Sequence, residues 1–395
     1  MGFTRASLTA LVAALVLPWC SGSVTGPEPA EPLPGAVAWS RHRVDGEALP
    51  DAEQAEPQTV ADFLTDAGRQ NTDELVERFP FVMGNLDGAP LRTRFAANRR
   101  AIALERARLA AVAADQSLSE PARSSARRTE AMYRRLAENR RPVLLFDPRG
   151  RGRYAEVHGD LANATHVAVV VPGTGISTRS FDPRSGHVGT PGAMAAELYR
   201  TQRALSPAAS TAVVAWAGYA TPQALGVGAA TARYAEAGAE ELRDLIDGLI
   251  AARSSPDAGH PTRSTTRVTL LCHSYGSVVC GRAAEKLPEA VHDIVVFGSP
   301  GMGVDTVTEL HTDARLWAAL GPSDWIRHVP NVRFLGFGHG RAPTSAAFGA
   351  RRIPATDVRG HDGYLHRDTD TARRFAQISL DLVSEPHHTG ADTHR

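Results

Sequence analysis

The chain shows two different patterns of apolar positions. Between residues 59 and 140, apolar positions recur at the spacing of amphipathic helices, as at Leu91, Phe95, Ile102, Leu109 and Val112. From about residue 143, short apolar runs alternate with helical stretches, and the run at 166–171 is apolar almost throughout. A continuous run of this kind is typical of a strand that is buried on both faces of a sheet.

The second pattern predicts a sheet with helices on both of its faces. We expect strands at 143–146, 153–157, 166–171, 211–216, 267–271, 294–297 and 315–320. We expect helices at 193–205, 229–252, 276–287 and 370–384. Strands that alternate with helices form a parallel sheet covered on both sides. The predicted fold class is therefore α/β, with a mostly parallel central sheet and a helical N-terminal segment before it.

The N-terminus predicts export. Arg5 precedes an apolar run over 8–17, and small residues follow at 21–23. This pattern is typical of a secretory signal peptide, and the run is too short to span a membrane. We therefore expect a signal peptide over residues 1–23 and a secreted or cell-envelope location. Lipid attachment at Cys20 is the alternative, which the bulky Trp19 before it disfavours.

Composition divides the rest of the chain. Residues 24–58 are rich in Pro, Ala, Glu and Gly without a periodic apolar pattern, which predicts a flexible linker. A helical N-terminal region over 59–140 and an α/β domain over 141–385 follow. The last residues, 386–395, are expected to form a disordered tail.

The balance of charge excludes some classes of partner. The chain has 43 basic and 43 acidic residues, so nothing in it indicates a nucleic-acid binder. Arginines gather between residues 92 and 141. A solvated helix face is the simpler interpretation of this cluster, and the alternative is a surface for anionic lipid or a partner, which would allow peripheral association with the cell envelope. The oligomeric state stays open.

The cysteines predict neither a disulfide framework nor a metal site. The chain has three, Cys20, Cys272 and Cys280, an odd and low number. We expect Cys272 and Cys280 to lie two helical turns apart, too far to bridge, as small buried apolar residues. No His or Cys stands at zinc spacing from them, so we expect no metal and no cofactor.

The sharpest local signal is a predicted strand that runs into Cys272-His273-Ser274-Tyr275-Gly276 and then a helix. This order matches the G-x-S-x-G nucleophile elbow, with Cys272 in place of the first glycine. The elbow needs small residues two positions before and after the serine, because strand and helix approach closely there. Ser274 is therefore the candidate nucleophile. His273 is expected to pack on the other side of the turn.

An oxyanion hole requires backbone N–H groups aimed at the developing negative charge. One is expected from Tyr275, directly after the nucleophile. The second is expected from the glycine-rich loop at 172–176, which follows the predicted strand 166–171. We choose Thr174 as this donor, with Gly175 or Ser177 as possible helpers. A plain glycine-rich turn is the alternative.

The acid and the base should follow the nucleophile in the order Asp, His. Asp324 comes after the predicted strand 315–320, where a carboxylate would emerge at the carboxyl edge of the sheet. His361 stands just ahead of the final helix, where the last loop of such a sheet delivers its histidine. The alternatives to these two residues are Asp305 for the acid and His339 or His366 for the base.

With these residues in hand, the chain resembles a family of actinobacterial serine α/β-hydrolases catalogued largely as a domain of unknown function. The resemblance runs from about residue 60 to 384. It is carried by Gly84 to Pro90, Arg94, 97–99, V-P-G-T-G at 171–175, H-S-Y-G-S at 273–277, G-S-P-G at 298–301, Asp324, H-G at 339–340, F-G-A at 348–350 and G-H at 360–361. The resemblance implies an α/β-hydrolase fold over the 141–385 domain and Ser274, Asp324 and His361 as a triad. Two departures are Cys272, where the family usually has glycine, and 341–343, which lacks the expected acidic residue.

These observations predict an exported serine hydrolase that cleaves carboxylic esters through an acyl-enzyme. The substrate would be a small-molecule or lipid acyl ester. Two other functions stay open. The first is a non-catalytic binding module with a degenerate elbow, favoured only by Cys272. The second is amide hydrolysis or acyl transfer by the same triad.

Overall fold

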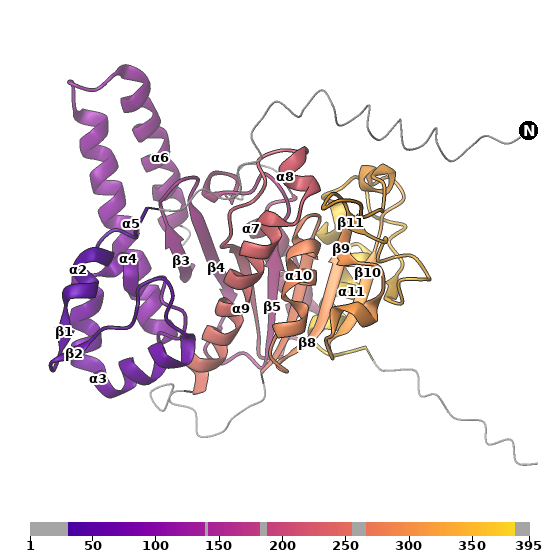
Figure 1. Cartoon of the computed structure of the whole chain (residues 1–395), viewed down its shortest axis with the longest axis horizontal. Coiled ribbons are helices and arrows are strands. Elements are labelled where there is room, and N and C mark those ends of the chain that lie inside the picture. The colour runs from indigo at the N-terminus through magenta and orange to yellow at the C-terminus, as the bar shows by residue number, and fades with distance from the viewer. Residues whose placement is uncertain (1–30, 139–140, 182–187, 255–265, 384–395) are drawn as a thin grey trace, which may run out of the picture.

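The structure of the protein is a computed structural model that describes residues 31–138, 141–181, 188–254 and 266–383. One large sheet dominates it, with strand order β12-β10-β8-β7-β5-β6-β4-β3 (Figure 1). Its strands are β3 (Val143–Asp147), β4 (Arg153–Gly159), β5 (His166–Val171), β6 (Thr211–Ala217), β7 (Arg267–His273), β8 (Val291–Phe297), β10 (Arg315–Ala319) and β12 (Arg351–Ile353). Among these strands, only β4 runs in the opposite direction to the others, so it is antiparallel to both β3 and β6. The predicted α/β fold class is confirmed.

Two hydrophobic clusters fill the two faces of this sheet. In β5, Val167, Val169 and Val171 belong to one cluster, whereas Ala168 and Val170 belong to the other. Successive side chains of a strand point to opposite faces, so a strand covered on both sides must be apolar at every position. This is the physical reason for the continuous run at 166–171.

Helices from different parts of the chain cover the two faces. The helices α9 (Arg233–Ser254) and α10 (Gly276–Ala283) contribute to the cluster that holds Val169. The helices α7 (Pro191–Leu205) and α11 (Asp370–Ser379) contribute to the cluster that holds Val170. The shorter elements of this domain are η2 (Thr178–Phe181), α8 (Val227–Ala230), η5 (Ala284–Lys286), β9 (Gly301–Val304), η6 (Val307–Leu310), η7 (Trp325–His328), β11 (His339–Gly340) and η8 (Gly363–Leu365).

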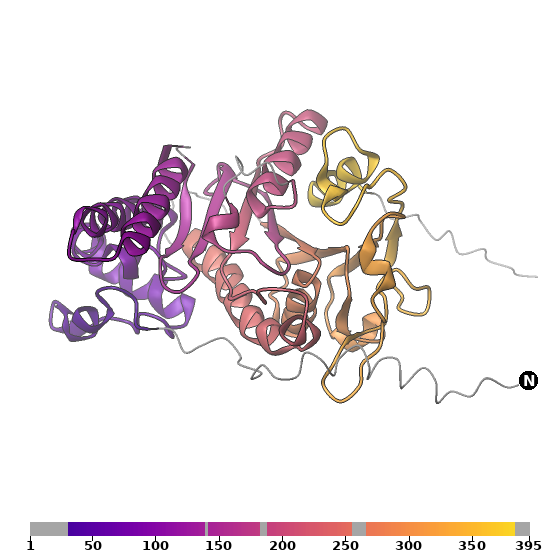
Figure 2. The same ribbon diagram turned by 90° about the horizontal axis from the view of Figure 1, so that it is seen from above.

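The N-terminal region is helical and lies beside the β3 edge of the sheet (Figures 1 and 2). Its elements are α2 (Ala36–Arg41), β1 (Arg43–Val44), β2 (Glu47–Ala48), α3 (Pro57–Arg78), α4 (Pro80–Met83), α5 (Leu91–Ala114) and α6 (Glu120–Glu138). It has its own apolar cluster, which includes Trp39, Leu64 and Phe79. None of the helices in the described ranges combines the length and the apolar character needed to cross a bilayer.

The expected flexible linker over 24–58 is wrong from residue 31 onward. Trp39 is 1% exposed, and its indole N–H donates to the Pro50 carbonyl oxygen at 2.7 Å. Its ring also packs edge-on against Phe79 with 5.5 Å between centroids. A single buried aromatic residue thus anchors a segment whose Pro-rich composition gives no periodic signal. The expected signal peptide, the Cys20 anchor and the tail at 386–395 lie outside the described residues.

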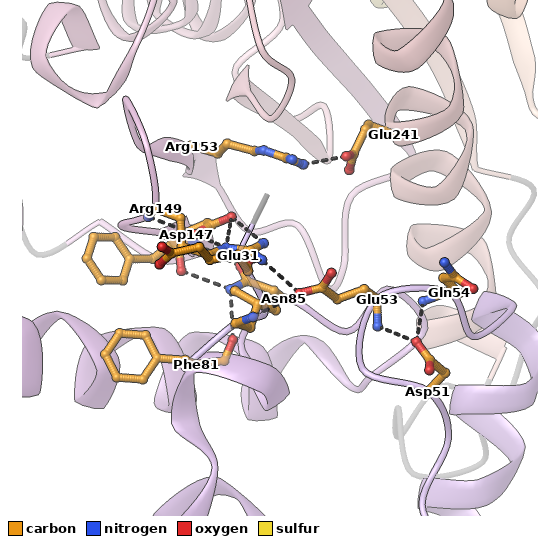
Figure 3. A network of polar contacts seen from close by, with 12 residues as sticks. Glu31, Asp51, Glu53, Gln54, Phe81, Asn85, Asp147, Arg149, Arg153 and Glu241 are labelled. Atoms are coloured by element: carbon orange, nitrogen blue, oxygen red, sulfur yellow. Dashed lines mark hydrogen bonds and ion pairs between the residues drawn. The ribbon is translucent and has the colours of Figure 1, made fainter. Parts of the chain in front are cut away.

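The side chain of Asn85 joins the N-terminal region to the open edge of the sheet. Its Oδ1 accepts from the Phe146 backbone N–H at 3.0 Å, and its Nδ2 donates to the Phe146 carbonyl oxygen at 2.9 Å. The amide thereby pairs with β3 as a further strand would, and it satisfies both outward-facing backbone groups of Phe146. Figure 3 shows Asn85 at this junction, near Arg149, which binds Asp147 and Glu53.

We expect Asn85→Ala to lower the free energy of unfolding by about 2–3 kcal/mol, because both backbone groups of Phe146 lose their partner while they stay buried. Urea denaturation followed by circular dichroism measures this loss. The control is Asn71→Ala, since Asn71 on α3 is only half-buried and its donation to Ala67 and Asp45 joins no sheet edge. The control should change stability by about 0.5 kcal/mol or less. Equal losses in the two variants would contradict the role of Asn85.

Candidate active site

The chain reverses sharply at Ser274, between the end of β7 at His273 and the start of α10 at Gly276. Ser274 has φ +54°, in the left-handed region that non-glycine residues rarely adopt. A side chain at Gly276 could not exist here, because its Cβ would lie 2.5 Å from the Val171 carbonyl oxygen. Glycine therefore lets α10 begin directly against β5. The strained turn presents the Ser274 hydroxyl at the carboxyl edge of the sheet.

His361 and Asp324 extend from Ser274 in one hydrogen-bonded series. The Nε2 atom of His361 lies 2.9 Å from Ser274 Oγ, and its Nδ1 atom lies 2.8 Å from Asp324 Oδ1. Nδ1 faces a carboxylate and so carries the ring proton, which leaves Nε2 as the acceptor for the serine hydroxyl. The structure thus brings His361 together with Asp324, 37 positions before it, and with Ser274, 87 positions before it.

The Asp324 carboxylate is fully buried, and hydrogen bonds satisfy both of its oxygens. Oδ1 also accepts from the Ile326 backbone N–H at 2.9 Å, and Oδ2 accepts from the Tyr364 hydroxyl at 2.5 Å. Burial by itself would raise the pKa of Asp324, but the hydrogen bonds from His361, Tyr364 and Ile326 outweigh it and lower that pKa. Asp324 therefore stays ionised beside the imidazole, as a group that supports a developing imidazolium must.

Tyr364 is the residue at this site that the sequence did not indicate. Burial and the bond to Asp324 raise the pKa of its phenol, so the hydroxyl stays protonated and donates. The same oxygen accepts from the Gly321 backbone N–H at 3.0 Å, which ties the acid to the loop after β10. No periodic or motif signal marks Tyr364, since its role depends on η8 folding back under Asp324.

His273 contacts both the backbone and the imidazole ring of His361. Its Nε2 lies 2.8 Å from the His361 carbonyl oxygen, and the two imidazole centroids are 4.7 Å apart. Burial, with the nearby His361, lowers the pKa of His273 to about 4, so its ring is neutral near pH 7 and donates from Nε2. His273 therefore hydrogen-bonds to the backbone of His361 and not to Ser274, its neighbour in the sequence.

The backbone N–H groups expected to bind an oxyanion belong to Tyr275, directly after Ser274, and to Thr174, next to Gly173. No hydrogen bond among the described residues uses the N–H of Tyr275 or of Thr174. A Cβ on Gly173 would lie 2.6 Å from Ser274 Cβ and 3.2 Å from the Tyr275 nitrogen, so this loop closes directly on the elbow. The N–H of Gly175 is instead donated to Pro222, and that of Ser177 to Ser180. These two expected helpers are therefore engaged elsewhere.

The alternative acid and bases have other partners. Asp305 accepts from the Arg341 backbone N–H at 3.0 Å. His339 Nε2 lies 2.6 Å from the Ala229 carbonyl oxygen, and exposed His366 lies beside the Arg367 carbonyl oxygen. Within the described ranges, no group of three or more His, Cys, Asp or Glu side chains is arranged to hold a metal ion.

The expectation that Cys272 and Cys280 lie too far apart to bridge is wrong. They form a disulfide across a Cα–Cα distance of 6.5 Å, and both are fully buried. The prediction counted two helical turns between them, but α10 begins only at Gly276, so Cys280 lies about one turn into it. Cys272 points to the face of the sheet that α10 covers. The reversal at Ser274 returns Cys280 to that face, within bonding range.

One family model and two curated relatives match the chain. Residues 147–334 match a family model described as alpha/beta hydrolase. Two uncharacterized proteins, from two strains of Mycobacterium tuberculosis, are each 28% identical over 386 residues, covering 82% of this chain. The chain spans 56% of the length of these curated relatives.

Solved structures of hydrolases resemble the chain at low identity. A serine hydrolase from Xanthomonas campestris, described as lacking a lid, is 16% identical, with a TM-score of 0.35 over 60% of this chain and 92% of its own. The 2,6-dihydroxy-pseudo-oxynicotine hydrolase is 13% identical, with a TM-score of 0.35 over 88% of this chain and 92% of its own.

We expect Tyr364→Phe to lower the free energy of unfolding at pH 7 by about 1.5–3 kcal/mol, because Asp324 loses a charge-assisted hydrogen bond. The lowered pKa of Asp324 stabilises the folded state above the unfolded pKa of about 3.9, and that stabilisation is lost as pH falls through the folded value. The gap between variant and wild type should therefore narrow below about pH 4.

Urea unfolding at pH 7, 5 and 3.5 measures this gap. The control is Tyr199→Phe on α7, whose phenol has no hydrogen bond among those of the described residues. Its effect should stay within about 0.5 kcal/mol at every pH. A gap for Tyr364→Phe that does not change with pH would contradict the coupling to Asp324.

Replacing both cysteines, in Cys272→Ala/Cys280→Ala, should lower the free energy of unfolding by about 2–3 kcal/mol, the entropy of closing so short a loop. Urea denaturation with and without dithiothreitol measures the effect. Reductant should destabilise the wild type by a similar amount and leave the double variant unchanged, which separates loss of the bond from loss of packing. A wild-type curve that reductant does not move would count against the disulfide.

Proposed function

We propose that the protein is a serine hydrolase that cleaves carboxylic esters, a function that suits its α/β-hydrolase fold. One observation carries the proposal: Asp324, His361 and Ser274 form a hydrogen-bonded series at a strained turn. The N–H groups of Tyr275 and Thr174, which have no hydrogen bond among the described residues, support it. Fold alone would not support an activity, since α/β hydrolases include diverse functions.

The first half of the proposed reaction forms an acyl-enzyme. Ser274 Oγ attacks the ester carbonyl carbon while His361 Nε2 takes the hydroxyl proton. The carbonyl oxygen becomes an oxyanion, which accepts from the backbone N–H groups of Tyr275 and Thr174. Collapse of this intermediate breaks the bond to the leaving alcohol oxygen, which receives the proton from His361. Asp324 stabilises the imidazolium throughout.

The second half repeats these proton movements with water. His361 takes a proton from a water molecule whose oxygen attacks the acyl carbon. The tetrahedral intermediate uses the same two N–H groups, and its collapse breaks the bond to Ser274 Oγ, which regains the proton from His361. The products are a carboxylic acid and free enzyme.

Cys272 does not weigh against this proposal. The non-catalytic alternative depended on Cys272 as a sign of a degenerate elbow. Cys272 is bonded to Cys280 beneath the turn, so its side chain has a structural use that leaves the elbow glycine at Gly276 in place.

A fluorophosphonate probe should label Ser274 in the wild type and leave Ser274→Ala unlabelled, as measured by mass spectrometry of the labelled peptide. Hydrolysis of p-nitrophenyl butyrate should fall at least about 10³-fold in Ser274→Ala, because the nucleophile is lost. The control is Ser299→Ala, whose hydroxyl lies in the loop after β8, donates to the Gly301 carbonyl oxygen and accepts from the Gly301 N–H. It should keep both labelling and hydrolysis. A wild type that is folded by circular dichroism but takes no label would overturn the proposal.

A further inference from the structure

The exposed large apolar side chains of the described residues are unevenly distributed. A few lie far from the candidate site, on the N-terminal region or after α11: Val37, Leu104, Leu118 and Leu382. The others lie on loops at the carboxyl edge of the sheet, and we call them the apolar rim: Val188, Leu225, Trp325, Val332, Phe334, Leu335 and Phe337. Gathered exposed apolar side chains mark interaction sites, whereas single ones do not.

Three segments of the apolar rim are anchored to the site itself. The Trp325 ring lies 4.7 Å from the His361 imidazole, centroid to centroid, and is still 39% exposed. Next to Val188, Gly189 packs so closely on Asp362 that a Cβ would lie 2.4 Å from that side chain. The loop that holds Leu225 accepts the Gly175 N–H at Pro222, 2.8 Å away.

The fourth segment, 329–338, spans from one side of the site to the other. It begins after η7, which carries Trp325 against His361. It ends where Gly338 donates to the Ala230 carbonyl oxygen at 2.8 Å. Directly after it, His339 packs edge-on against Tyr275 with 5.5 Å between centroids. Figure 1 shows α8 and β11 at the same end of the sheet.

The tip of this segment is a tight turn that holds an apolar side chain in water. Phe334 and Phe337 exchange two backbone hydrogen bonds of 2.9 Å, and both central residues have positive φ, +49° at Leu335 and +82° at Gly336. Asn-Gly is the favoured pair in such a turn. Here the first position is a leucine that is 81% exposed. This leucine is therefore unfavourable both in conformation and in solvation, and nothing within the described part of the fold buries it.

We propose that the apolar rim docks the protein on lipid aggregates that contain its acyl-ester substrate. This inference rests on the proposed function. The rim surrounds the edge where Ser274 lies, so a protein or second copy seated there would cover the nucleophile. A lipid surface instead delivers the ester to it. The charge of this stretch suits anionic headgroups, because residues 325–337 contain no acidic residue and two arginines. Of the two, Arg333 is half-exposed and pairs with Asp305, whereas Arg327 donates to the Pro322 carbonyl oxygen.

The test uses Ser274→Ala protein, so that binding is measured without hydrolysis. It should sediment with vesicles of phosphatidylcholine and phosphatidylglycerol. Adding Leu335→Asp should weaken this partitioning at least about tenfold, because the leucine can no longer enter the apolar layer. The matched control is Leu118→Asp, an exposed leucine on the turn between α5 and α6, which should bind as before.

A second readout uses active protein. In Leu335→Asp, the ratio of the rate on a vesicle-borne long-chain ester to the rate on soluble p-nitrophenyl butyrate should fall at least about tenfold. In Leu118→Asp this ratio should stay at the wild-type value.

The outcomes separate the two proposals. Fluorophosphonate labelling of Ser274 without vesicle binding overturns the docking surface alone. The same holds for vesicle binding that Leu335→Asp does not weaken, and for a dimer in gel filtration that Leu335→Asp dissociates. A folded wild type that binds vesicles but takes no label overturns the serine hydrolase, and the substrate role of the rim with it.

Discussion

The site depends on one backbone constraint, the left-handed conformation of Ser274 between β7 and α10. A non-glycine residue holds this conformation only where its surroundings determine it. Here Gly276 seats α10 against the end of β5, and the disulfide between Cys272 and Cys280 joins the strand to the helix below the turn. The loop at Gly173 also closes on this turn, because a Cβ on Gly173 would lie 2.6 Å from Ser274 Cβ and 3.2 Å from the Tyr275 nitrogen.

The acid and base are held by a network that is larger than a triad. Asp324 is buried and accepts three hydrogen bonds, from the His361 imidazole, the Tyr364 hydroxyl and the Ile326 backbone N–H in its own η7 turn, so it can stay charged without water. Burial lowers the pKa of His273, so its ring stays neutral and donates to the His361 carbonyl oxygen. Near pH 7 both side chains are therefore deprotonated, Asp324 as a charged carboxylate that hydrogen bonds stabilise and His273 as a neutral imidazole.

The N-terminal region covers the β3 edge of the sheet. β3 is an edge strand, and an open edge exposes backbone groups that can pair with other chains. Asn85 pairs with Phe146 at that edge, and α5 packs alongside it. The region lies at the end of the sheet away from β10 and β12 (Figure 2).

The sequence by itself determined what depends on local periodicity: the continuous apolar run of β5, the strand and helix on either side of Ser274, and the order of Ser274, Asp324 and His361. The tertiary structure decided what depends on contacts between distant segments. The Cys272–Cys280 bond follows from the direction in which α10 returns, and Tyr364 reaches Asp324 only because η8 folds beneath it. Trp39 fixes a segment whose composition predicted a linker. Periodicity records which face of an element is buried, but not which residue of another element it meets.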